Sequence, residues 1–158
     1  MTVQIPLTRG LVALVDDEDA EWLGRWKWTT TKLRHGHIYA VRRERDASGV
    51  TRAIRMHRAI LGAPDGALVD HIDRDTLNNT KANLRVCDRS QNGANRKINA
   101  NSILGVKGVR LVKHGRYRAT IAVRGKRLHL GYFDTVQEAS DAYQQAARAH
   151  FGIFARLA

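Results

Sequence analysis

VDHIDRDTLNNTKANLRVCDRSQNGANR, residues 69–96, is the stretch that decides the fold of this chain. It opens with an apolar run that ends in Asp70 and His71, crosses a loop rich in asparagine, and returns through the apolar residues 84–87. Asp88 can then cap a helix, and the glutamine three residues further on completes a capping box. The stretch therefore predicts the order strand, loop, strand, helix.

His71 is set among several side-chain amides. Taken singly, each of these asparagines suits a turn, because asparagine tolerates left-handed backbone. Together they suggest a different use. An imidazole can take a proton from water at neutral pH. Carboxylate and amide oxygens are hard ligands for Mg²⁺ or Mn²⁺. Asp70 and His71 point to opposite faces of their strand, so one can face a metal and the other the attacking water. The pattern predicts phosphodiester hydrolysis.

The spaced polar residues carry a family resemblance. D-H-I-D, then L-N-N-x-x-x-N-L, then S-x-N-x-x-N resembles the HNH nucleases, and MHR at 56–58 resembles the residues upstream of that motif. The likeness covers roughly residues 50–97 and is nearest to phage-borne homing endonucleases. It implies a ββα-metal fold and a DNA endonuclease that uses a single divalent metal, Mg²⁺ or Mn²⁺, in each active site.

The resemblance also implies roles for individual residues. His71 corresponds to the general base, and Asp70 and Asn92 correspond to the metal ligands. Asn83 corresponds to the residue that orients the histidine ring, with Asn79 as the alternative, which we otherwise expect to brace the loop. Many members have a second histidine at the position of Asn92, so the set found here resembles the strand-nicking branch.

Charge is distributed unevenly along the chain. The formal net charge is +12, with balances of +4 over residues 1–60, −1 over 61–95 and +9 over 96–158. A basic surface of this kind attracts polyanions, and nucleic acid is the commonest partner, although a basic surface also aids solubility. The concentration of charge in one segment favours nucleic acid as the partner.

Several classes of protein are disfavoured by the composition. The single cysteine, Cys87, excludes an intrachain disulfide and a multi-cysteine zinc site. We find neither an apolar run of membrane-spanning length nor a secretory signal. We therefore expect no membrane association and a cytoplasmic protein encoded by a phage or bacterium. No obligate protein partner is inferred, and both a monomer and a dimer remain open.

The C-terminal region predicts a small sheet covered by a helix. Residues 106–133 contain three strand-like runs separated by glycine-containing turns. Thr135 and Glu138 form a capping box for a helix that ends at Gly152. In RYRATIAVR the arginines alternate onto one face and apolar residues onto the other. An ordinary half-exposed sheet would look similar, but the density of arginine favours a DNA-binding face.

This region, about residues 106–152, resembles the AP2 DNA-binding domain. The matching residues are G-V-R at 108–110, L-G-Y-F-D-T at 130–135, and the spaced E-A, A-Y and A-A pairs of the helix. The resemblance implies that the sheet binds the DNA major groove. The expected DNA contacts are Arg110, Arg116, Arg118, Arg124 and Arg127, with Lys107, Lys113 and Lys126 as further phosphate contacts.

The N-terminal residues 1–58 are expected to be rich in strands. Two short strands flank a turn at residues 8–10, and a short helix follows Asp16 or Asp17. HIYAVRRE (37–44) and VTRAIRMHR (50–58) predict a hairpin. We expect the three tryptophans to belong to the core, because a small domain needs their bulk, although they could also stack on bases.

Together these patterns predict an α+β protein that acts as a site-directed DNA endonuclease of homing type. We expect an HNH nuclease domain over residues 1–97, with a β-rich part at 1–58 and a ββα-metal core at 59–97. A linker at 98–105 and an AP2-like domain at 106–158 would follow. The alternatives are a non-catalytic DNA-binding regulator and a nonspecific nuclease. Three cations could be phosphate contacts or surface residues: Lys81, Arg85 and Arg96.

Overall fold

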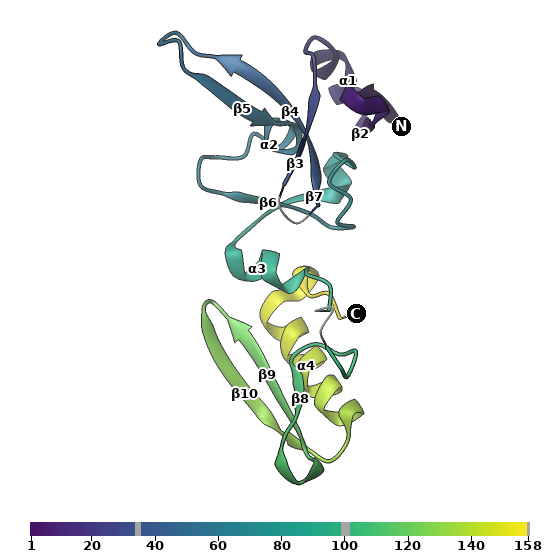
Figure 1. Cartoon of the computed structure of the whole chain (residues 1–158), viewed down its shortest axis with the longest axis vertical. Coiled ribbons are helices and arrows are strands. Elements are labelled where there is room, and N and C mark those ends of the chain that lie inside the picture. The colour runs from purple at the N-terminus through teal and green to yellow at the C-terminus, as the bar shows by residue number, and fades with distance from the viewer. Residues whose placement is uncertain (34–35, 99–101, 158) are drawn as a thin grey trace. The chain divides into compact units, whose positions relative to one another are not determined.

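The computed structural model describes residues 1–33, 36–98 and 102–157. His35 and the middle of the expected linker, residues 99–101, lie outside the described residues. The chain divides into two compact units, Met1–Cys87 and Asp88–Ala158. Figure 1 labels the helices and most of the strands of both. The mixed α+β class expected from the sequence is confirmed.

The first unit consists of short antiparallel sheets. Two of them are hairpins, and the third has the strand order β3-β4-β5. The strands of the unit are β1 (Thr2–Pro6), β2 (Val12–Asp16), β3 (Thr29–Lys32), β4 (Ile38–Arg45), β5 (Thr51–Arg55), β6 (Leu68–His71) and β7 (Leu84–Cys87). Its helices are α1 (Asp17–Gly24) and α2 (Met56–Leu61), with single 3₁₀ turns at Thr8–Gly10 and Lys81–Asn83. The hairpin β6–β7 is the one predicted from the opening stretch.

One strand prediction is wrong at its end. The residues MHR were expected to continue the strand from residue 50, but β5 ends at Arg55 and Met56 begins α2. Met56 is fully buried and packs in the core with Leu23 and Val15. The helix places His57 on the same buried side. Burial of the methionine side chain therefore overrides the strand propensity of the run.

The tryptophans divide between core and surface. Trp28 is 2% exposed and donates a hydrogen bond from Nε1 to the carbonyl oxygen of Leu23 at 2.9 Å. Trp22 packs against the edge of the same core. Trp26, in contrast, is 46% exposed, and the guanidinium of Arg42 lies 4.0 Å from its ring centre. The core prediction is confirmed for Trp28 and is wrong for Trp26, which instead makes a cation–π contact.

The second unit is a three-stranded antiparallel sheet packed on one long helix (Figure 1). Its strand order is β10-β9-β8. The elements are α3 (Arg89–Ala94), β8 (Val109–Leu111), β9 (Tyr117–Val123), β10 (Lys126–Phe133) and α4 (Val136–Phe151), with 3₁₀ turns at Lys113–Gly115 and Gly152–Phe154. The capping boxes that begin α3 and α4 are both present, as predicted.

Small residues allow the sheet to approach α4 closely. Ala119 of β9 packs with Ala139 of the helix. Gly108 has a φ of +68°, and a Cβ there would lie 2.4 Å from the carbonyl oxygen of Thr120 and 2.3 Å from the Tyr143 ring. Only glycine accepts both this positive φ and the absence of space for a Cβ atom. In the part of the chain that the structure describes, no helix is long and apolar enough to cross a membrane.

Candidate active site

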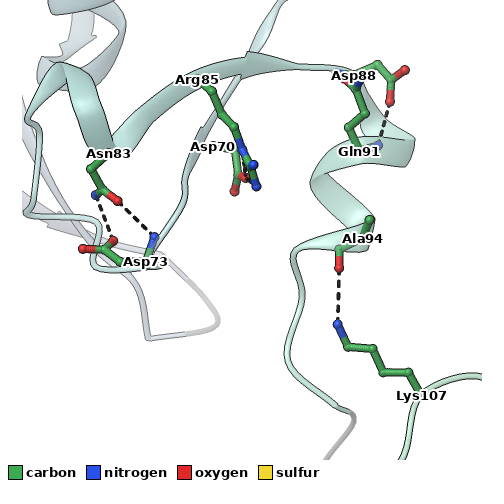
Figure 2. A network of polar contacts seen from close by, with 8 residues as sticks. All are labelled: Asp70, Asp73, Asn83, Arg85, Asp88, Gln91, Ala94 and Lys107. Carbon is green, nitrogen blue, oxygen red and sulfur yellow. Dashed lines mark hydrogen bonds and ion pairs between the residues drawn. The ribbon is translucent and has the colours of Figure 1, made fainter. Parts of the chain in front are cut away.

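The loop between β6 and β7 is held by its own polar side chains. Asn83 donates from Nδ2 to Asp73 Oδ1 and to the backbone carbonyl of Asn78, both at 2.8 Å. Its Oδ1 accepts from the backbone N–H of Asp73 at 3.0 Å (Figure 2). These bonds use both ends of the amide to fix the loop. Asn83, the expected partner of the histidine ring, thus has the bracing role in this structure.

The amide bonded to the His71 ring belongs to Asn79. Asn79 Oδ1 lies 3.3 Å from His71 Nε2, and the two residues are 1% and 4% exposed. The backbone N–H of Asn79 donates to the carbonyl oxygen of Leu14 on β2 at 2.7 Å. A strand far away in the sequence therefore positions the amide. The spacing of the asparagines offered no means of choosing Asn79, because β2 is absent from the motif.

The orientation of the Asn79 amide determines which ring nitrogen of His71 carries a proton. Asn79 Nδ2 donates to the carbonyl oxygen of Leu77 at 3.1 Å, so Oδ1 is the atom directed at the ring. An oxygen can only accept, and Nε2 of His71 must therefore donate. The basic lone pair of the neutral ring is then on Nδ1, the nitrogen suited to take a proton from water.

Two further aromatic side chains pack beside His71. The His57 ring centre lies 5.0 Å away in an edge-on arrangement, and the Tyr39 ring centre lies 6.1 Å away. His57 is 4% exposed. The MHR resemblance pointed to His57 without giving it a role. Nothing in the sequence indicated Tyr39, because its ring comes close to that of His71 only in the folded chain.

The surroundings keep both histidines uncharged at neutral pH. Burial chiefly, together with the neighbouring His71 ring and the guanidiniums of Arg55 and Arg58, lowers the pKa of His57 to about 3. Burial also lowers the pKa of His71, although the hydrogen bond with Asn79 and the nearby carboxylates oppose this effect. An uncharged ring is the form of histidine that can accept a proton.

Asp70, beside His71 in the sequence, is paired with a largely buried arginine. Arg85 donates from Nε and Nη2 to Asp70 Oδ2 at 3.0 and 2.8 Å (Figure 2). The two side chains are 8% and 10% exposed, and they face each other across the β6–β7 pairing. Arg85 is therefore not a surface residue. It compensates a carboxylate that would be costly to bury alone.

The donors of this hairpin fit a divalent metal by their chemistry. Asp70 supplies carboxylate oxygen, the ligand type that Mg²⁺ and Mn²⁺ prefer. An ion bound there would share the carboxylate with the guanidinium of Arg85. The other expected ligand, Asn92, lies on α3 and so belongs to the second unit.

A cluster of three carboxylates lies where β2 meets α1. Oxygen atoms of Asp16, Glu18 and Asp19 all fall within 4.8 Å of one another. Lys81 neutralises much of this charge, because Nζ lies 2.6 Å from Glu18 and 3.1 Å from Asp19. The Glu18 contact chiefly raises the pKa of Lys81. Lys81, which could have been a phosphate contact, is thus committed to this cluster.

The second unit carries a basic groove. Its volume is about 700 Å³, and it is lined by the β9 residues that alternate with those packed on α4. The cations along it include Arg96, Lys97, Arg110, Arg118 and Arg127. Arg118 Nε is buried without a hydrogen-bond partner. Four other expected contacts, Lys113, Arg116, Arg124 and Lys126, are exposed.

Two expected DNA contacts make structural bonds instead. Lys107 donates from Nζ to the carbonyl oxygens of Ala94 and Arg156, at 3.3 and 2.6 Å; Figure 2 draws the first of these bonds. Lys107 therefore joins the end of α3 to the C-terminal tail. Arg116 pairs with Asp134 at 3.1 Å and donates to the carbonyl oxygen of Tyr132 at 3.0 Å.

Comparison with known proteins identifies the region around His71. A family model described as HNH endonuclease matches residues 57–94. An uncharacterized HNH endonuclease of Acanthamoeba polyphaga mimivirus, L560, is 35% identical over 92 residues, which are 58% of this chain and 47% of that protein. The chain therefore contains an HNH endonuclease domain. The HNH match suggests DNA endonuclease activity, and such nucleases generally use a divalent metal.

Two other relatives match this chain over very different shares of their own length. Protein 3.8 of Escherichia phage T7 is 31% identical over 95 residues, which are 60% of this chain and 78% of that protein. This chain belongs to the same family as protein 3.8. Dehydration-responsive element-binding protein 2A of Arabidopsis thaliana is 48% identical over 59 residues, 36% of this chain but 18% of that protein. The chain thus spans about half of the mimivirus protein and less than a fifth of the plant protein.

Proposed function

We propose that this chain is a metal-dependent DNA endonuclease of homing type that cuts at directed sites. The observation that carries the proposal is the buried, uncharged His71, held by Asn79 at the end of β6 beside Asp70. A neutral imidazole can accept a proton from water, and a carboxylate can hold a divalent metal; a phosphodiester hydrolase can use both groups.

In this proposal His71 Nδ1 takes a proton from the attacking water as the water oxygen bonds to phosphorus. The bond from phosphorus to the 3′ oxygen breaks, which leaves a 5′ phosphate and a 3′ hydroxyl after protonation. Asn79 holds the ring through Nε2 and so keeps Nδ1 basic. Asn83 fixes the loop that carries this arrangement. Asn79 thereby takes the positioning role for which the resemblance favoured Asn83.

A bound Mg²⁺ or Mn²⁺ would supply stabilisation of the negative charge that develops on the phosphate and on the leaving oxygen. We propose Asp70 as one ligand from its position beside His71. We also propose Asn92 as the second ligand, because its position in the sequence corresponds to a metal ligand of the HNH motif. The partner strand of Asp70 supplies Arg85, whose two hydrogen bonds to Oδ2 hold the carboxylate in its orientation.

We further propose that the C-terminal unit binds double-stranded DNA through its arginine-rich sheet face. The basic groove supports this, because its cations come from β8, β9, β10 and the residues after α3. Arginine side chains on a sheet can bond phosphates and guanine edges. Among the expected contacts we retain Arg110, Arg118, Arg124 and Arg127 with Lys113 and Lys126. Arg116 and Lys107 are left out because their cationic groups bind protein acceptors.

The test is cleavage of supercoiled plasmid in Mg²⁺, Mn²⁺ or EDTA by wild type, His71→Ala and His150→Ala. His150 is an exposed histidine of α4 and serves as the matched control. Cutting should need both metal and His71, fall by about 10²- to 10⁴-fold without the base, and be unaffected at His150. Open circles without linear product would indicate nicking.

Tight binding of the plasmid by all three proteins, with no cutting under either metal, would overturn the nuclease proposal. The chain would then be a DNA-binding regulator. Cutting at many unrelated sites would retain the nuclease but overturn the directed, homing type.

A further inference from the structure

The loop after His71 contains an arginine in an unfavourable backbone conformation. Arg74 has a φ of +70°, in the left-handed region that glycine and asparagine prefer. Its N–H donates to the carbonyl oxygen of His71 at 3.0 Å, so the two residues close one tight turn. Conformational strain at a position next to a reactive group is a reason to look for a function of the side chain.

The guanidinium of Arg74 is also unusually short of partners. Nε and Nη1 are buried and have no hydrogen-bond partner, and Arg74 forms no ion pair with any described residue. Its neighbours Asp73 and Asp75 would be obvious partners, but their carboxylates bind elsewhere in the loop. Asp73 accepts from Asn83 and Asn78, and Asp75 accepts from the backbone N–H of Leu77.

The local charge adds a second reason. The end of β6 and the turn after it carry the carboxylates of Asp70, Asp73 and Asp75, which would repel an approaching phosphate. Three cations lie between residues 61 and 87, and two of them are already paired: Arg85 with Asp70 and Lys81 with the acidic cluster of α1. Arg74 is the remaining positive charge close in sequence to the proposed general base.

We propose that Arg74 binds a phosphate of the DNA duplex next to the bond that is cut. This inference rests on the proposed nuclease function and names a substrate contact that the HNH pattern did not supply. An arginine can donate two parallel hydrogen bonds to a phosphate. The tight turn holds the backbone of Arg74 close to that of His71. A duplex bound by Arg74 would therefore have its neighbouring phosphate held near the general base.

A pair of matched variants separates this role from an effect on folding. Arg74→Gly and Arg9→Gly each remove one arginine from a left-handed position, at φ values of 70° and 65°, and Arg9 lies in the turn between β1 and β2. In both, glycine relieves the backbone but adds freedom to the unfolded chain, so the thermal midpoints should stay close to that of wild type. Arg74→Asn, which also accepts this conformation, is the second uncharged variant.

Each protein is assayed for plasmid cleavage and for binding of a short duplex in EDTA. We expect Arg74→Gly and Arg74→Asn to lower kcat/KM about tenfold or more, as for loss of a charged hydrogen bond, and Arg9→Gly to match wild type. Arg74→Lys should recover part of the loss, because it keeps the charge but lacks the planar fork.

The outcomes separate the two proposals. Equal cleavage by Arg74→Gly, Arg74→Asn and Arg9→Gly in an active wild type would overturn the phosphate contact and leave the nuclease intact. An inactive wild type would overturn the nuclease proposal. The binding assay would then decide whether Arg74 contacts DNA. A weaker affinity for Arg74→Gly than for Arg9→Gly would retain the contact, and equal affinities would overturn it.

Discussion

The two units use their arginines in opposite ways. In the first unit Arg85 is 10% exposed and paired with a buried aspartate, and its side chain is part of the hairpin. In the second unit Arg110 and Arg127 are exposed on a sheet that packs on α4, and Arg124 is exposed in the turn between β9 and β10. Buried charge needs a partner, whereas exposed charge is left to attract one. Arg85 thus has a structural role, whereas the three exposed arginines of the second unit have a proposed binding role.

The largest expected difference compares a buried and an exposed ion pair. Asp70→Ala should lower the free energy of unfolding by about 3–5 kcal/mol, because it removes the largely buried carboxylate that Arg85 binds. Asp134→Ala, which removes the partner of half-exposed Arg116, should cost at most about 1 kcal/mol. Urea unfolding measures both. Asp70→Ala combined with Arg85→Met should recover much of the loss, and equal costs for the two single changes would contradict the distinction.

The next effect concerns pH and the buried His57. Its folded pKa of about 3 lies below the unfolded value of 6.5, so the unfolded chain binds more protons in acid. The stabilisation is complete above pH 6.5 and is lost as pH falls from 6.5 toward 3. Between pH 7 and pH 5 wild type should lose about 2 kcal/mol more than His57→Phe. Urea unfolding at both pH values in EDTA is the measurement, and parallel losses in the two proteins would contradict it.

A smaller effect is expected on DNA affinity. The double change Arg110→Ala with Arg127→Ala should weaken binding of a duplex by about 1 kcal/mol for each arginine removed and lower the slope of log K against log salt by about 2. Arg148→Ala on α4 removes an exposed charge away from the groove and is the control. Binding titrations from low to moderate salt test this, and an equal effect of Arg148→Ala would show that only net charge matters.

The smallest expected effect is a difference in stability between variants of two lysines, both of which were expected from the sequence to contact phosphate. Lys107→Met should lower the free energy of unfolding by about 1–2 kcal/mol, because the carbonyl oxygens of Ala94 and Arg156 lose a charged donor. Lys113→Met should stay within about 0.5 kcal/mol of wild type, as expected for an exposed residue. Thermal unfolding distinguishes them. A destabilised Lys113→Met would contradict the assignment of Lys107 alone to structure.

Local sequence predicted the elements well where a short-range signal was present. The capping boxes at Asp88 and Thr135 begin α3 and α4, because a cap is formed by residues three apart. The alternation in RYRATIAVR placed Arg118 and the apolar residues of β9 on opposite faces, as predicted, whereas Arg116 and Arg124 lie just outside the strand. The strand predicted through MHR failed because burial of Met56 in the core, which depends on distant segments, decided for a helix.

The sequence by itself determined the order of elements, the basic C-terminal half and the set of residues able to do hydrolytic chemistry. Those properties depend on side-chain type and on spacing along the chain. The tertiary structure decided which amide meets His71, which cations are already paired, and which aromatic rings enclose the site. Asn79 is positioned by Leu14, Lys81 is bound by Glu18, and Tyr39 comes from β4. Each of these interactions joins segments far apart in sequence, and short-range patterns carry no information about them.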